Sequence, residues 1–477
     1  MLKCASKIPH ENRRIYYFEL LKSQACCLDS GLLSIGKDMW LTLKQHYFSE
    51  VLTSYIAKHK KLVNRLILSF AYAFIFASSF SIFISNLGFW FLIALWLYKK
   101  YISDDTFNFA ADKPYPLYLP ILSFMAIHVF SWFISPDLWN SVCSSSNLLN
   151  MLIFFAVIDL HEYLPDIKKV SFVLLVTNIM ILLLIPLVLL LKLTNNLYFC
   201  EYNDWAVNFK GFFSVHITYG TYLVMTVLLN LSVAYHCYSN NKAFQRTIYL
   251  LCALLCFSIA LTSSRSAWLA LTFSLLVFFS IIKRSKYVFV TLFIIVTAFI
   301  TINYFNLNCG FVDNFKNRFQ QAVSGNSNGR GHIWNVGCRI IMDNPILGVG
   351  GGGLKHYFPL YDKHSIYSST THLHNLLLNI WAELGVLGLI VFSWLLISMF
   401  KMSIDLYKNC KKPEARASAL AVILMTYALF VIGFTEYNFC KVEISRLFWF
   451  VVGYAGFNYL NNVKASCEKN NTVLFNN

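Results

Sequence analysis

One polar stretch interrupts an otherwise apolar sequence and concentrates residue types that can carry chemistry. It extends from Gly329 to Glu383 and contains Arg330, a GVGGGG run and two histidines, His372 and His374. A histidine side chain exchanges a proton near neutral pH, which suits general base catalysis. An arginine stays protonated and presents a planar fork to phosphate oxygens. We therefore expect the chemistry of the protein in this stretch.

Charged residues also stand at the ends of apolar segments or inside them. A charged side chain at membrane depth is costly unless it is paired or faces a watery cavity. Arg265 therefore suits either a phosphate group or, by snorkelling, the lipid headgroups. Lys210 could add a phosphate contact or anchor a helix at the interface, and Arg330 could bind phosphate or be a solvated cap residue. Glu383 could orient His374 or an arginine, or join two helices by a hydrogen bond.

The two histidines are separated by one residue, so on a helix they would point about 200° apart. If a helix already includes His372, then His372, Asn375 and Glu383 share one face, which favours His372 as the functional residue. A helix that begins at 374 or 375 leaves the choice open. A zinc site is disfavoured because this spacing cannot converge on one metal and no third ligand is apparent. The glycine run lacks a Walker lysine, so its predicted role is loop flexibility.

The composition indicates an integral membrane protein. Hydrophobic residues make up 57% of the 477 residues and charged residues only 13%, against about 25% charged in soluble proteins. The net charge of +16 does not indicate nucleic-acid binding, because the basic residues are scattered among loops between apolar runs. A bias of basic residues toward the cytoplasm explains it better.

Recurring apolar runs predict an all-α polytopic protein with about twelve transmembrane helices. Two runs, 87–98 and 148–160, are short for a bilayer of about 30 Å and could be re-entrant. The expected spans lie near residues 65–84, 87–98, 115–134, 148–160, 170–193, 212–235, 247–262, 266–282, 287–305, 373–400, 417–434 and 445–460.

The basic residues of the loops predict the orientation of these spans. The count leaves out the amino-terminal segment and the long loop after 305, because long loops do not follow the rule. In the twelve-span arrangement most of the remaining loop lysines and arginines then fall on one side, and Lys210, Arg265, Lys441 and Arg446 fall on the other. The richer side is expected to be cytoplasmic. The expected parts are a cytoplasmic extension (1–61), nine spans (62–305), a periplasmic loop with short helices (306–372), three spans (373–460) and a cytoplasmic tail (461–477).

Four segments of the chain resemble, in order, motifs of the bacterial O-antigen ligase and polymerase family. They are GFFSVHITYG (Gly211–Gly220), LTSSRSAWLAL (Leu261–Leu271), GRGHIWNVGCRIIMDNPILGVGGG (Gly329–Gly352) and HNLLLNIWAELG (His374–Gly385). The resemblance covers roughly residues 62–460 in layout, and the first sixty residues have no counterpart.

The resemblance implies a GT-C-type glycosyltransferase on the periplasmic face of the bacterial inner membrane. Such enzymes transfer a glycan from undecaprenyl-pyrophosphate to an acceptor hydroxyl, without a metal or another cofactor. In ligases, the leading interpretation here, the acceptor is a lipid A core sugar; polymerases and protein O-oligosaccharyltransferases use other acceptors. The family's catalytic histidine directly precedes an asparagine, which selects His374 as the base. Arg265 and Arg330, with Lys210 as a third contact, would then bind the pyrophosphate, and attack opposite it would invert the anomeric centre.

A polysaccharide exporter or flippase is the alternative from another class. A transporter places polar groups along a path near the midplane and often has internal repeats. Here the polar candidates gather on the outer side and no convincing repeat is found between the halves. The sequence therefore favours an enzyme.

Overall fold

The structure is a computed structural model that describes residues 61–102, 116–184, 200–203, 206–284, 286–287, 330–362, 372–439 and 441–475. The chain divides into two units, Met1–Asn64 and Arg65–Asn477. The helices from α3 onward and all predicted site residues belong to the second unit. The predicted extension at 1–61 falls outside the described residues except for Lys61, and so does most of the span expected at 287–305.

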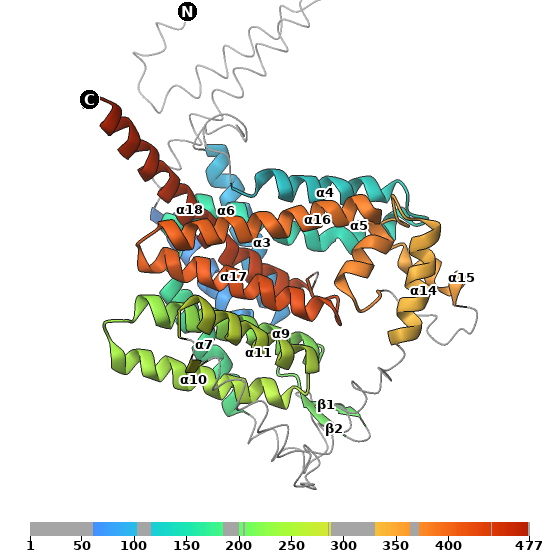
Figure 1. The fold of residues 1–477 in the computed structure, drawn as a ribbon, viewed down its shortest axis with the longest axis horizontal. Coiled ribbons are helices and arrows are strands. Elements are labelled where there is room, and N and C mark those ends of the chain that lie inside the picture. The colour runs from blue at the N-terminus through green and yellow to red at the C-terminus, as the bar shows by residue number, and fades with distance from the viewer. Residues whose placement is uncertain are drawn as a thin grey trace, which may run out of the picture. The chain divides into compact units, whose positions relative to one another are not determined.

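The second unit is built of helices (Figure 1). Residues 65–77 are helical. The elements after them are α3 (Ile82–Ile102), α4 (Tyr118–Trp132), α5 (Leu138–Ser145), the short 3-10 helix η2 (Ser146–Met151), α6 (Leu152–Leu160), η3 (His161–Tyr163), α7 (Ile167–Leu183), β1 (Cys200–Asn203), β2 (Ala206–Phe209), α9 (His216–Cys237), α10 (Lys242–Leu261), α11 (Arg265–Ile281), α14 (Arg330–Asp343), α15 (Leu354–Tyr361), α16 (Leu376–Asn409), α17 (Pro413–Gly433) and α18 (Val442–Phe475).

The protein is a polytopic helical membrane protein. Six described helical segments are long and apolar enough to cross a bilayer, and two shorter apolar helices, α4 and α11, lie where further spans were predicted. The two runs suspected of being re-entrant belong to longer segments of 19 and 26 residues. The six segments are Ile82–Lys100, Leu138–Tyr163, His216–Cys237, Lys242–Leu261, Leu376–Asn409 and Pro413–Gly433.

Within the described residues, a short hairpin departs from the all-α prediction. Strands β1 and β2 pair antiparallel, with Cys200 opposite Phe209. The hairpin leads through Lys210 toward α9. Between them lies Gly211, whose positive φ of 56° suits a residue without a side chain.

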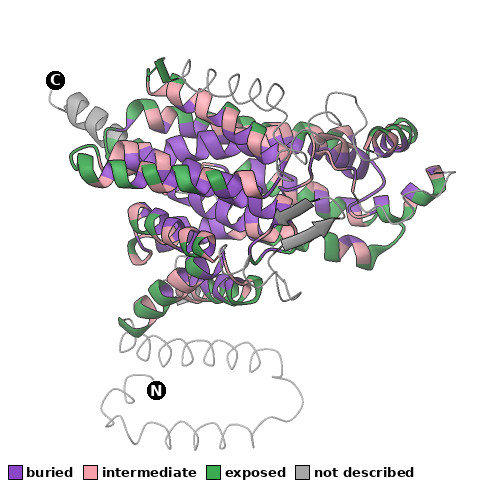
Figure 2. Cartoon of the chain, turned by 90° about the horizontal axis from the view of Figure 1, so that it is seen from below, coloured by how far each residue is buried: buried purple, intermediate pink, exposed green. Residues whose placement is uncertain are grey.

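Helices α9 and α17 form the centre of the unit. The apolar window of α9 is 89% buried and that of α17 78%, whereas the window of α10 is only 33% buried. Helix α9 packs against α17, α10, α7 and α11, and Figure 2 shows buried residues concentrated in the interior. Because α10 exposes large apolar side chains such as Leu250 and Phe257, we assign it to the lipid-facing periphery.

The two ends of these helices differ in what they carry. At one end, basic residues form ion pairs with acids of other helices. Lys100 Nζ lies 3.0 Å from Asp159 Oδ2, and Lys168 Nζ lies 2.8 Å from Glu414 Oε1. At the other end lie α14, α15 and the β1–β2 hairpin (Figure 1). We call these the basic end and the loop end.

Candidate functional site

A buried carboxylate at the loop end holds two of the predicted site residues. Glu436 follows α17, Arg330 is the first residue of α14, and His374 lies just before α16. Glu436 Oε1 accepts a hydrogen bond from Arg330 Nη2, and its Oε2 lies 3.3 Å from His374 Nδ1. One acid therefore joins a cation and a histidine that are far apart in the sequence.

The environment of Glu436 favours its ionised form. Its side chain is only 8% exposed. Burial opposes ionisation, but the hydrogen bond with His374 and the charge of Arg330 together lower the pKa of the Glu436 carboxyl below its ordinary value. The group is therefore a carboxylate at neutral pH, and a buried carboxylate requires partners of this kind.

The backbone at His374 is strained. Its φ is +47°, a left-handed conformation that non-glycine residues adopt rarely and that costs of order 1–3 kcal/mol when the surroundings impose it. Helix α16 begins at Leu376, and its N-cap residue is Asn375, whose side chain accepts a hydrogen bond from Leu378 N. Neither histidine is helical, so the idea that a helix places His372, Asn375 and Glu383 on one face is wrong.

Two hydrogen bonds and a close packing contact fix the segment around His374. Asn375 Nδ2 donates to Phe434 O at 3.1 Å, and Trp334 Nε1 donates to Leu373 O at 3.0 Å. Gly337 of α14 faces Leu373 so closely that a Cβ at that position would lie 2.6 Å from its side chain. Helix α14, which supplies Arg330, thus also positions the histidine segment.

His372 lies beside His374 but has different surroundings. The two rings are 4.3 Å apart between centroids, and the His372 ring lies 6.2 Å from that of Tyr437. Burial, aided by the nearby His374 and Lys441, lowers the pKa of His372 to about 4. An imidazole with so low a pKa is neutral at pH 7 but is a weak proton acceptor.

The glycine run is an ordered partner of a broken helix, which corrects the expectation of a flexible loop. The helical backbone of α16 is interrupted at Gly385, whose φ is 67° and ψ −172°. The carbonyl groups freed near this kink accept hydrogen bonds from the run: Val349 N donates to Ala382 O and Gly350 N donates to Glu383 O, both at 2.9 Å. A Cβ on Gly348 would lie 2.5 Å from the Glu383 backbone, so the close approach requires glycine.

Glu383 serves the same junction through its side chain. Its Oε1 accepts a hydrogen bond from Gly352 N at 3.1 Å. It also lines a pocket together with His372. Of the two roles considered from the sequence, this contact resembles the structural one, although Glu383 joins α16 to the glycine run and not to another helix.

Arg265 and Lys210 lie at the same loop end. Ser264 caps α11 directly before Arg265, and Gly220 of α9 lies so close to Ser264 that a Cβ there would be 3.3 Å from its side chain. The next residue of α9, Thr221, accepts a hydrogen bond from Asn438 Nδ2 at 2.9 Å. Asn438 lies two residues after Glu436 in the sequence. Contacts through α9 therefore connect the start of α11 with the Glu436 turn.

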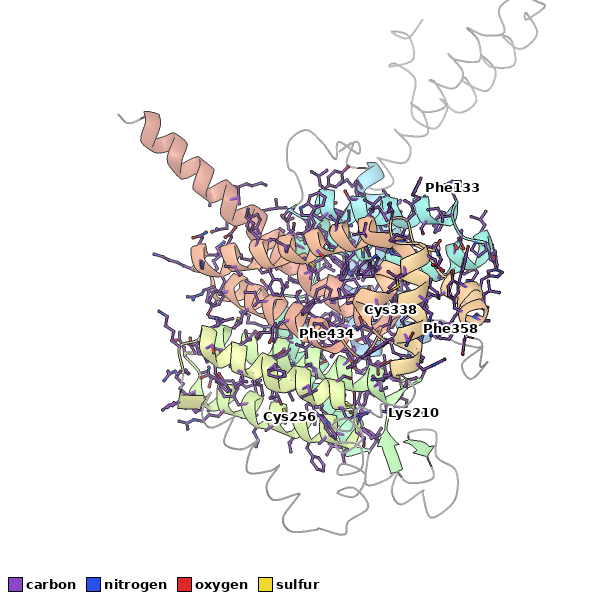
Figure 3. All side chains as sticks on the ribbon, turned by 45° about the vertical axis from the view of Figure 1, so that its right-hand side comes forward. Phe133, Lys210, Cys256, Cys338, Phe358 and Phe434 are labelled. Carbon is purple, nitrogen blue, oxygen red and sulfur yellow. The ribbon has the colours of Figure 1, made fainter. Side chains whose placement is uncertain are left out.

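The position of Lys210 follows from its place between β2 and α9. It is half-buried, and Figure 3 shows it at the end of the helices where Phe434 and Phe358 also lie. The structure thus brings Arg330, His372 and His374 together, and places Arg265 and Lys210 at the same end.

Glu436 is the residue that the sequence reasoning missed. It stands in the turn TEYNFC between two apolar helices. The available signal was electrostatic, since an acid in an apolar setting needs a basic partner and the predicted arginines needed a counter-charge. Within the parts of the chain that are described, no group of three or more His, Cys, Asp or Glu residues could hold a metal ion.

Comparison with known proteins finds one family similarity, over part of the chain. A search of curated proteins finds no match. Residues 250–393 match the family model described as O-antigen ligase. The matched segment includes Arg265, Arg330, both histidines and Glu383, whereas Lys210 and Glu436 lie outside it. Over these residues the chain is therefore similar to the O-antigen ligase family.

Proposed function

We propose that this protein transfers a glycan from undecaprenyl-pyrophosphate to a hydroxyl of the lipid A core, as an O-antigen ligase of the GT-C type. The observation that carries the proposal is the buried Glu436 carboxylate, which binds Arg330 with one oxygen and His374 with the other. A histidine held by an acid beside an arginine fits proton abstraction next to a phosphate leaving group.

His374 is the general base in this mechanism. With Nδ1 protonated and donating to Glu436, Nε2 is the ring atom that accepts the proton of the acceptor hydroxyl. The acceptor oxygen then forms a bond to the anomeric carbon while the bond from that carbon to the pyrophosphate oxygen breaks. Because attack occurs opposite the leaving group, the anomeric configuration is inverted.

The basic residues receive the negative charge that gathers on the leaving group. Arg330 uses one amino group for Glu436 and retains further N–H donors for phosphate oxygens. Arg265 and Lys210 would approach the pyrophosphate from the side of α11 and β2. Since these cations supply the electrostatic stabilisation, the proposed transfer needs no divalent metal.

The sidedness of the reaction follows from the two ends of the unit. The positive-inside tendency assigns the basic end, with Lys100 and Lys168, to the cytoplasm. The loop end then faces the periplasm of the bacterial inner membrane, where the carrier-linked glycan and the acceptor would meet.

Purified full-length protein in detergent, mixed with carrier-linked glycan and lipid A core, tests the proposal. We expect core-attached glycan from the wild type, with no loss of activity on addition of a chelator. His374→Asn should lower the rate about 10²- to 10⁴-fold, because asparagine tolerates the positive φ but cannot act as the base. Arg330→Ala and Arg265→Ala should also weaken donor binding.

The possible failures of this assay have different meanings. Product with a second carrier-linked glycan or with a protein as acceptor, but none with the core, would indicate a polymerase or a protein O-oligosaccharyltransferase. No transfer to any acceptor, together with movement of glycan across liposomes, would replace the enzyme with an exporter or flippase. Full activity of well-folded His374→Asn would refute the base assignment.

A further inference from the structure

A pocket of about 320 Å³, with apolar walls and a few polar groups, opens beside the histidine pair, on the side of α4, α5 and the glycine run. Its floor is buried: Glu383 is 7% exposed, Ser145 6% and His128 7%. Aromatic rings of Phe124, Tyr437 and Phe439 form part of its lining. Aromatic surfaces combined with a few buried hydrogen-bonding groups are suited to a small polar ligand such as a sugar ring.

The floor holds hydrogen-bonding groups that the described protein atoms do not fully use. His128 Nδ1 is buried and has no hydrogen-bond partner among the described residues. Glu383 uses Oε1 for Gly352 N, and Asn140 Nδ2 donates to Gly352 O at 2.9 Å. A buried polar atom without a partner costs about 1–3 kcal/mol. His128 Nδ1 has almost no accessible surface, so the polar groups that the floor offers to a ligand are the side chains of Glu383 and Asn140.

The rim of the pocket is positively charged. Lys355 and Lys441 both line it and are exposed. Arg446 follows Ser445, which lines the pocket. Its guanidinium is buried, with Nε donating to Asn150 Oδ1 at 2.8 Å and with its carbon 4.1 Å from the centre of the Phe89 ring. These cations favour a ligand that carries a negative charge near the rim and hydroxyl groups near the floor.

The turn after α17 separates this pocket from the Glu436 cluster. Glu436 binds Arg330 and His374, and Asn438 binds Thr221 on α9. The alternating residues Tyr437, Phe439 and Lys441 line the pocket instead. This turn therefore has one face that holds Arg330 and His374 through Glu436 and another face that lines the pocket.

We propose that this pocket is the acceptor subsite and that it selects a sugar residue bearing a carboxylate or a phosphate. This inference rests on the proposed transfer, because the Arg330 face is assigned to the donor. The hydroxyl groups of the acidic sugar bind the floor at Asn140 and Glu383, and its anionic group binds Lys355 and Lys441. A second hydroxyl of the same acceptor then reaches His374 past His372.

Binding measurements on the full-length protein test the pocket without requiring transfer. The probes are glucuronate, glucose 6-phosphate and neutral glucose, measured by ligand-observed NMR. We expect at least one anionic probe to bind roughly tenfold more tightly than glucose, because each exposed lysine contributes a modest ion pair. Lys355→Met/Lys441→Met should abolish this preference, whereas Lys411→Met at the basic end should keep it. The tighter of the two anionic probes distinguishes a carboxylate from a phosphate.

A variant that fills the pocket tests whether the probes bind inside it or only at the exposed lysines. Ser144 lines the pocket and is exposed, so Ser144→Phe can fill the space without disturbing the core. It should abolish binding of all three probes. Equal affinity of the wild type for charged and neutral probes, or an unchanged preference in Lys355→Met/Lys441→Met, overturns the proposal.

Transfer assays separate the subsite from the reaction itself. With acceptors that differ only in the anionic group, removal of the charge should raise KM about tenfold in the wild type and have no effect in Lys355→Met/Lys441→Met. Transfer without any dependence on acceptor charge overturns the acceptor subsite while leaving the ligase proposal intact. A charge preference in binding without transfer to any acceptor would instead overturn the ligase proposal, and with it the acceptor role of the pocket.

Discussion

The Lys168–Glu414 pair at the basic end and the pairs of Glu436 at the loop end are built differently. At the basic end, Lys168 and Glu414 are 34% and 40% exposed, so water screens their attraction. At the loop end, Glu436 is 8% exposed and shares its two oxygens between Arg330 and His374. An exposed pair can exchange partners with water at little cost, whereas the buried acid holds its partners in one arrangement.

The loop end contains several features that fix the geometry of its side chains. The loop end combines the buried acid with a strained His374 and with a helix broken at Gly385. Strained backbone persists only where the surrounding structure enforces it, and it concentrates at functional sites. The basic end also has a non-glycine residue of positive φ, Lys283 at 55°, but its positive charges are expected mainly to set the orientation.

The largest effect is expected from adding a side chain at Gly385, where α16 is interrupted. Gly385→Ala places a Cβ 2.0 Å from Ile346 O and requires a φ of +67° with a ψ of −172°, a region that is nearly restricted to glycine. We expect severe loss of folded protein, measured by size-exclusion chromatography and by Tm in detergent. Gly331→Ala is the matched control, since nothing lies within 4 Å of its Cβ position. Normal yield and Tm of Gly385→Ala would contradict the kink.

The next largest effect is expected from removing the charge of Glu436 and not that of Glu414, the acid at the basic end. Glu436→Gln keeps the shape of the side chain but removes the charge that orients His374, so kcat should fall roughly 10²-fold. The pH–rate profile should also change, because His374 loses its charged partner. A merely structural role of Glu436 would change kcat without moving the profile.

Glu414→Gln at the basic end is the control for that experiment. Its partner Lys168 is partly exposed and lies in the first turn of α7, at the end of the unit opposite to α14. We expect kcat and the pH–rate profile to remain at the wild-type values. A similar loss in both variants would mean that the two ends do not differ in the way their ion pairs suggest.

The sequence predicted those features that depend on composition and local pattern. Apolar runs indicated the helices, and the arginine and histidine motifs indicated the segment that matches the family model. Helix α14 begins at Arg330, within the loop in which short helices were expected. These features depend on neighbours in the chain.

The features that the sequence did not predict depend on contacts across the fold. The partnership of Glu436 with Arg330 spans 106 positions, and no local periodicity reports it. The order of the glycine run likewise depends on carbonyl groups released by the kink at Gly385. The sequence marked the run from Gly348 as a flexible loop, and only the fold shows that this run binds the kink at Gly385.

A smaller effect is expected when the pH is lowered, through the buried His372 at the loop end. Burial lowers the pKa of His372 from 6.5 to about 4, so the unfolded chain binds a proton below pH 6.5 that the folded protein excludes until about pH 4. Stability should therefore be complete above pH 6.5 and fall as the pH decreases toward 4. His372→Asn should reduce the difference in Tm between pH 7 and pH 5, and His356→Asn, on the exposed face of α15, should not. An equal Tm difference in wild type and His372→Asn would contradict the assignment.

The smallest effect is expected at the basic end. Lys168→Met removes one partly exposed ion pair, which contributes about 0.2–1 kcal/mol and less in high salt. The change in Tm should stay below about 4 °C for a chain of this size and should shrink further when salt is added. Arg330→Met, at the loop end, leaves Glu436 buried beside a single partner and should lower Tm more. If Lys168→Met were as damaging as Arg330→Met, exposure would not be what separates the two ends, and the fixed geometry around Glu436 would lose its significance as evidence for a site.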